Sequence, residues 1–215
     1  MKEVFKDYKN NSIKFEKYQI IGIICLLIVV AGTTGWIYEF IFYYFNGGMQ
    51  KFYMQGGNFL PWINIYAVGS ILILLCTYKY KKNPLKVFLI SVISTGVLEY
   101  FSGLAIYKLC DGLRLWDYNV EILNFGNIGG FVCLRSVLIF GFGGLGLLYY
   151  ILPFLIYLSK KISKKAFLIV SITLCSICLC DEFYNLVIAR AINTPRASAV
   201  YKELGFEYVK FEKGK

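Results

Sequence analysis

The chain has 215 residues, of which 58% are hydrophobic and only 17% are charged. Soluble domains usually carry about 25% charged and about 45–50% apolar residues, so this composition predicts an integral membrane protein. The same figures exclude a disordered chain, a collagen-like chain and a disulfide-rich secreted scaffold. The chain has no histidine, which excludes histidine-based acid–base catalysis and histidine metal ligands.

Five apolar segments are long enough to cross a bilayer as helices, which takes about 20 residues. In chain order they are residues 18–45, 58–78, 85–109, 130–158 and 166–192. We therefore predict an all-α, polytopic membrane bundle of about five transmembrane helices, with an ordered outer loop between the third and the fourth. Residues 1–17 form a basic N-terminal segment, and residues 193–215 form a C-terminal tail.

The lysines predict the orientation of these spans. Two connections, second to third and fourth to fifth, carry four lysines each: Lys79, Lys81, Lys82 and Lys86, then Lys160, Lys161, Lys164 and Lys165. The positive-inside rule then predicts a multi-pass plasma-membrane protein with its N-terminus in the cytoplasm and its C-terminus outside, although the tail is itself basic. We interpret the net charge of +10 as this topology signal and expect no nucleic-acid partner.

Six polar residues of the predicted spans share one depth, the outer half of the bilayer: Glu39, Asn64, Glu99, Arg135, Asp181 and Glu182. Tyr66, in the second span, is a further candidate for the same site. The aromatic Trp36 and the loop residues Trp116, Asp117 and Asn127 lie on the same side. Ionisable groups within a membrane mark a functional site by default, so we predict an outward-facing acidic cavity that binds a cation or an amine. An interhelical ion network that holds the bundle together is the alternative, and an aromatic belt would explain the tryptophans equally well.

Five short motifs follow one another in the middle of the chain. They are GWIYE at 35–39, PWINIYAVG at 61–69, EYFSG at 99–103, LWDY at 115–118 and NIGGFVCLRS at 127–136. This order resembles the bacterial ABC-transporter type IV membrane protein family, which implies a permease-like role. The chain departs from the family pattern at four positions: Asn64 for proline, Ala67 for glycine, Asn119 for serine and Phe131 for arginine. Arg135 lies one helical turn beyond Phe131 and is placed to replace that charge.

The chain carries no P-loop motif, so an ABC-type system would need a separate ATP-binding subunit or another membrane protein as partner. We predict a transport component that lies in the lipid bilayer, uses no cofactor and is not itself an enzyme; a metal site is left open. Two alternatives remain. One is a sensor or assembly subunit that binds partner helices, and the other is a membrane enzyme in which a carboxylate acts as base on a lipid head group held by Arg135.

Overall fold

The computed structural model describes residues 2–10, 12–46, 53–54, 56–109 and 112–208. The end of the predicted C-terminal tail, residues 209–215, therefore lies outside the described residues. The chain divides into two compact units, one built from Met1–Ile71 and Ile151–Val209 and the other around Leu72–Tyr150. Each unit has its own packing and its own polar contacts.

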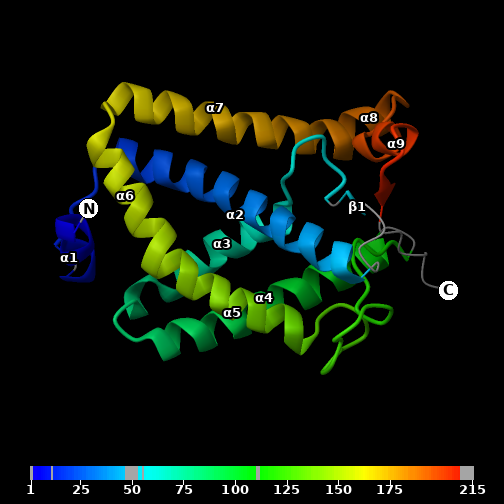
Figure 1. The fold of residues 1–215 in the computed structure, drawn as a ribbon, viewed down its shortest axis with the longest axis horizontal. Helices are drawn as coiled ribbons and strands as arrows, with labels where there is room; N and C mark the ends of the chain where they lie inside the picture. Colours follow the sequence, from blue (N-terminus) through cyan, green and yellow to red (C-terminus); the bar gives the residue numbers. More distant parts are fainter. Residues whose placement is uncertain (1, 11, 47–52, 55, 110–111, 209–215) are drawn as a thin grey trace. The chain divides into compact units, whose positions relative to one another are not determined.

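The first unit is built around two long helices, α2 (Lys17–Asn46) and α7 (Lys164–Phe183), which pack side by side and run in the same direction (Figure 1). The other elements of this unit are α1 (Lys2–Asn10), the start of α3 (Asn64–Thr77), α6 (Leu152–Lys161), the π-helical turn η3 (Tyr184–Ile188), α8 (Ala189–Ala191) and α9 (Ala197–Glu203). Two short strands, β1 (Tyr53–Met54) and β2 (Glu207–Tyr208), pair in parallel.

The beginning of α2 is fixed to the end of α6. The Tyr18 hydroxyl donates to the Ser159 carbonyl at 3.2 Å, and the Gln19 side-chain amide donates to the Ser159 hydroxyl at 2.9 Å. Gly22 of α2 faces the ring of Phe167 on α7, where any larger residue would collide with it. These contacts place the start of α2, the end of α6 and the start of α7 at one end of the unit.

The second unit consists of the 3₁₀ turn η1 (Tyr78–Tyr80), α4 (Pro84–Leu109), α5 (Leu134–Gly146) and the π-helical turn η2 (Leu147–Ile151). Helix α4 packs against α5 through a buried face on which residues recur every four positions: Val87, Ser91, Thr95 and Glu99. Small polar residues on such a face let two membrane helices approach closely. Glu99, at the end of this row, is the only ionisable member.

Four helical segments are long and apolar enough to cross a membrane among the residues that the structure describes. They are Lys17–Phe45, Pro84–Leu109, Leu134–Lys161 (α5, η2 and α6 together) and Lys164–Ala191. This confirms the predicted all-α membrane bundle. The second predicted span differs, because α3 has only 14 residues, or about 21 Å, and residues 58–63 before it are not helical. Backbone N–H groups of residues 58–63 donate hydrogen bonds to α2 and α7, which explains why this segment is not helical.

Candidate functional site

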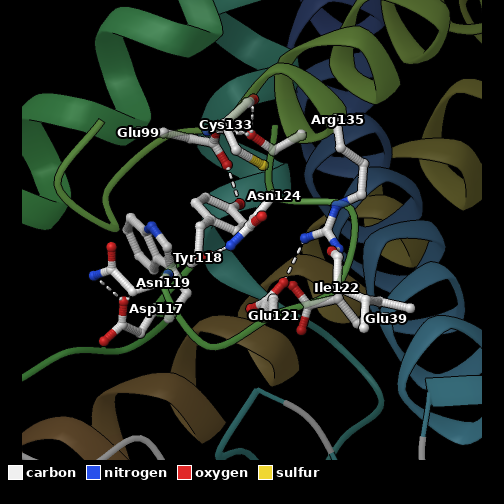
Figure 2. A network of polar contacts seen from close by, with 12 residues as sticks. Glu39, Glu99, Asp117, Tyr118, Asn119, Glu121, Ile122, Asn124, Cys133 and Arg135 are labelled. Atoms are coloured by element: carbon white, nitrogen blue, oxygen red, sulfur yellow. Dashed lines mark hydrogen bonds and ion pairs between the residues drawn. The ribbon is translucent and has the colours of Figure 1, made fainter. Parts of the chain in front are cut away.

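The Glu99 carboxyl group lies at the centre of a polar cluster in the second unit (Figure 2). It is only 4% exposed and accepts two hydrogen bonds from hydroxyl groups. Tyr118, in the loop before α5, donates to Oε1 at 2.8 Å, and Ser136, in the first turn of α5, donates to Oε2 at 2.7 Å. Glu99 thus joins α4, the loop and α5 through one carboxyl group.

Arg135 lies beside this carboxyl group and is also buried, with 9% exposure. Its guanidinium forms an ion pair with Glu121 and donates to the Ile122 carbonyl at 2.9 Å. The same guanidinium lies over the ring of Tyr118, 5.4 Å from the ring centroid. The Tyr118 side chain is therefore held between a cation on its face and a carboxyl group at its hydroxyl.

The environment of Tyr118 changes its acidity. Burial raises the pKa of the Tyr118 phenol well above its usual range, and the negative charge of Glu99 adds to this effect. The phenol therefore stays protonated and remains a hydrogen-bond donor to Glu99 throughout the physiological pH range.

The loop that carries Tyr118 is ordered by its own polar side chains. Asp117 accepts from the backbone N–H of Asn119 at 3.0 Å and pairs with Arg114 at 3.4 Å, while Asn127 accepts from the N–H of Gly130 at 2.8 Å. Gly130 has a φ of +80°, and a Cβ there would overlap the Arg114, Asp117 and Asn119 side chains. Only glycine fits this position.

Aromatic side chains close the loop over the end of α4. The Trp116 indole donates to the Phe131 carbonyl at 2.9 Å. The Arg114 guanidinium lies between the rings of Phe131 and Tyr107, 4.6 and 4.9 Å from their centroids. Phe131 stands where the motifs of the resemblance lead us to expect an arginine. Its ring instead forms a cation–π contact with Arg114, which another part of the loop supplies.

A second polar cluster belongs to the first unit and has adjacent carboxylates at its centre. Asp181 accepts from the backbone N–H groups of Phe59 and Leu60 at 3.1 and 2.7 Å. Glu182 accepts from the side-chain amides of Asn58 and Asn64, both at 2.6 Å. The end of α7 therefore binds the chain that leads into α3.

Helix α2 holds the same segment from another side. The Ile63 N–H donates to the Gly32 carbonyl at 3.1 Å, and the Trp62 indole donates to the Ile28 carbonyl at 3.1 Å. The Trp62 N–H donates to the Leu60 carbonyl at 2.8 Å, and Pro61 has no N–H. Every backbone N–H from 59 to 63 therefore has an acceptor. Non-helical backbone is tolerated at membrane depth only when it is satisfied within the protein in this way.

Glu39 and Tyr66 form a further contact in the first unit. The Tyr66 hydroxyl donates to Glu39 Oε1 at 3.0 Å, and the Tyr66 ring packs over Gly35, where no Cβ would fit. Trp36, in the same turn of α2, stacks on Phe40 with 5.2 Å between the ring centroids. These residues come from the first two motifs of the sequence.

The predicted site residues are distributed over the two units of the chain. Glu99, Asp117, Arg135, Trp116 and Asn127 belong to the second unit, and Glu39, Tyr66, Trp36, Asn64, Asp181 and Glu182 to the first. Within the described part of the chain, no group of three or more acidic or cysteine side chains is placed to hold a metal ion.

The sequence interpretation missed several contacting residues. Glu121, the ion-pair partner of Arg135, was not singled out because an acid in a loop is ordinarily exposed. One signal could have indicated Glu121: a buried arginine such as Arg135 needs a carboxylate partner. Asn58 and Trp62 were not predicted as site residues, because the apolar pattern placed Asn58 at the turn that begins the second span and Trp62 inside its helix.

Residues 26–186 match the family described as "Putative ABC-transporter type IV". The chain belongs to this family. The match covers most of the chain and includes both polar clusters, and it confirms the resemblance drawn from the motifs. No curated protein and no solved structure matches the chain.

In this member of the ABC-transporter type IV family, motifs far apart in sequence meet in space. The first and second motifs meet where Glu39 contacts Tyr66. The third, fourth and fifth meet where Glu99 contacts Tyr118 and Ser136. Together, family membership and four apolar helices fit a membrane transport-type protein.

Proposed function

We propose that the chain is the membrane-embedded component of a transport system and recognises its ligand at the Glu99 cluster. One observation carries this proposal: a carboxyl group lies buried in a long apolar helix, held by two hydroxyl groups from different elements. Burying an ionisable group in a membrane is costly, which makes it a functional candidate by default. A ligand could replace the two hydroxyl groups at the Glu99 carboxylate with its own N–H groups or with a metal ion. This exchange would not break an ion pair of Glu99 with Tyr118 or Ser136, because both donors are uncharged.

The composition of the cluster favours a cationic ligand. Among the described residues, the cluster contains three carboxyl groups, Glu99, Asp117 and Glu121, and two guanidinium groups, Arg114 and Arg135. An inorganic cation or an amine would balance the excess acid, and Trp116 and Asn127 would shape the entrance on the outer side. Glu39, with Tyr66 and Trp36, would supply a further polar position on the transport path.

The energy source would be a separate ATP-binding subunit, because this chain has no P-loop. We place the N-terminus in the cytoplasm, so that the two four-lysine connections face the side on which ATP is available. Co-purification of an ATP-hydrolysing partner with the tagged chain would support this part of the proposal.

Ligand-dependent thermal stability of the purified protein tests the site. A ligand that binds the folded state raises the unfolding midpoint, so a panel of inorganic cations and amines is added to wild type and to Glu99→Gln. Glu99→Gln preserves the shape of the side chain, and Glu203→Gln, an exposed acid on α9, is the matched control. We expect one ligand class to raise the midpoint of wild type and control but not of Glu99→Gln. An equal rise in all three proteins would refute the site.

A structural role for the other acidic group is the second candidate. Asp181 and Glu182 accept hydrogen bonds from four groups of residues 58–64, and Asp181 accepts another from Asn185 at 2.8 Å. All of these donors belong to the chain itself, which favours a network that stabilises the first unit for assembly with a partner. Asp181→Asn would then lower the unfolding midpoint without changing any ligand-induced shift.

A further inference from the structure

The turn between α3 and α4 (Figure 1) is rich in lysine and tyrosine. This lysine–tyrosine turn consists of Tyr78, Lys79, Tyr80, Lys81, Lys82 and Lys86. Its first three residues form η1, and its last lies in the first turn of α4. The proposal about Glu99 makes no use of this turn.

Aromatic rings draw the ammonium groups of the turn together. The Nζ atoms of Lys79 and Lys86 lie 4.8 and 5.8 Å from the centroid of the same ring, that of Tyr80. The Nζ atom of Lys81 lies 4.2 Å from the centroid of Tyr78. Each distance is within the range at which a ring attracts a cation, about 6 Å. Three positive charges are thus concentrated on one short turn.

Carboxylates are lacking on this stretch of the chain. No aspartate or glutamate occurs in the sequence from 71 to 98. Among the described residues, Lys79, Lys82 and Lys86 make no ion pair with a carboxylate. Burial lowers the pKa of Lys81, and the charge of Lys82 lowers it further, so two of these ammonium groups lie close enough to repel each other. An anion bound between them would offset this repulsion.

The other lysine-rich turn, residues 160–165 of the first unit, is different. Its Lys164 forms an ion pair with Glu16 at 2.5 Å. This turn therefore already has a carboxylate of its own, although it carries the same number of lysines. It provides an internal control for effects of positive charge in general.

We propose that Lys79 and Lys86, which share the Tyr80 ring, bind the phosphate group of an anionic phospholipid, and that Lys82 adds to the positive charge of this site. Lysine clusters directly beside a membrane-spanning helix attract anionic head groups, and tyrosines favour the head-group level of the bilayer. Apolar side chains near the turn favour a lipid over a free anion, because Leu75, Leu85 and Leu89 are 73%, 65% and 47% exposed. They offer an acyl chain a surface next to the lysines, which an acidic protein partner would not need.

Lipid retention by the full-length protein in neutral detergent tests the proposal. Phosphatidylglycerol or phosphatidylcholine is titrated in, and bound lipid is counted by native mass spectrometry. The test variant is Lys79→Gln/Lys82→Gln/Lys86→Gln, and the matched control is Lys160→Gln/Lys161→Gln/Lys165→Gln. We expect phosphatidylglycerol to bind wild type and control in preference to phosphatidylcholine, and to bind the test variant at least about tenfold more weakly.

Three results would overturn the proposal. Equal losses in the two triple variants would mean a general effect of charge, and inorganic phosphate binding as well as lipid would mean a free-anion site. Unchanged lipid binding with loss of a co-purified subunit would mean a protein docking surface. Should the triple variant fail to fold, Tyr80→Leu compared with Tyr80→Phe tests the same point, because only the second keeps the ring that gathers Lys79 and Lys86.

Discussion

At the scale of single residues, Tyr118 determines how the Glu99 carboxyl group is held. Tyr118→Phe removes the hydrogen bond to Glu99 and keeps the ring under Arg135. We expect a loss of about 1–2 kcal/mol at pH 8, because the carboxyl oxygen is left without one of its donors. The thermal midpoint of unfolding in one detergent would measure this loss as a fall of a few degrees.

The same variant is expected to respond to pH in a defined direction. The pKa of Tyr118 is raised in the folded protein, whereas in the unfolded chain it is about 10. The stability that Tyr118 contributes is therefore fully present below pH 10 and is lost as the pH rises beyond it. The difference in thermal midpoint between wild type and Tyr118→Phe should therefore become smaller above pH 10. A difference that grows with pH would contradict this assignment, and Tyr150→Phe, at a 72% exposed side chain, is the control.

Sequence reasoning identified Glu99 and Arg135 because each interrupts an apolar segment, which is a local feature. It could not identify Glu121, because the partner of a buried charge is chosen by the path of the loop. A common depth in the bilayer follows from counting residues along each helix, but which helices pack together does not.

At the scale of elements, the entry into α3 shows how tertiary contacts override an apolar pattern. Residues 58–78 are apolar enough to predict one long helix, and Pro61 is the only strong local sign against it. The segment instead donates its N–H groups to Asp181 on α7 and to the Gly32 carbonyl on α2. These acceptors lie about 120 residues later and about 30 residues earlier in the chain. The long helices were predictable because a sum of local hydropathies determines them.

Gly32 is the position at which this element can be tested. A Cβ at Gly32 would overlap the Trp62 indole, so Gly32→Ala must displace the ring that anchors the segment to α2. We expect Gly32→Ala to cost about 1–3 kcal/mol, as overpacking usually does, measured as a lower thermal midpoint.

Another helical glycine, Gly143, provides the control for Gly32→Ala. Gly143 is also in a helix, but a Cβ there would have no atom within 4 Å. Gly143→Ala should leave the midpoint unchanged or raise it, because alanine favours helix over glycine by up to about 1 kcal/mol. Equal effects of the two substitutions would mean that the Trp62 contact does not hold the segment.

At the scale of the whole molecule, contacts within the first unit limit the number of membrane crossings. The start of α2 and the end of α6 lie together, because Gln19 binds Ser159. The chain therefore leaves one side of the membrane through α2 and has returned to that side at the end of α6. Among the described residues between these points, α4 and the helix Leu134–Lys161 are the segments that meet the length expected of a span. Two crossings would leave the end of α6 on the opposite side of the membrane from the start of α2, so we predict that α3 provides a third crossing.

The crossing by α3 is physically reasonable despite its short helix. Its 14 residues cover about 21 Å of a hydrocarbon core of about 30 Å. The satisfied, non-helical residues 58–63 on one side and η1 on the other extend that distance. With α3 as a crossing, the chain would cross five times, and this number remains a prediction.

Five crossings predict opposite locations for the two termini, which reporter fusions can measure. Helix α7 starts beside Glu16 and Tyr18 and runs in the same direction as α2, so it carries the chain across a fifth time. With a cytoplasmic N-terminus, reporters fused after Asn83 and after Ile162 should be cytoplasmic, and one fused after Lys215 should be outside. An external reporter at Asn83 would show that α3 does not cross, and would contradict the pairing of Gln19 with Ser159. A cytoplasmic reporter at Lys215 would instead remove α7 from the spanning helices, because the other four crossings already return the chain to the cytoplasm.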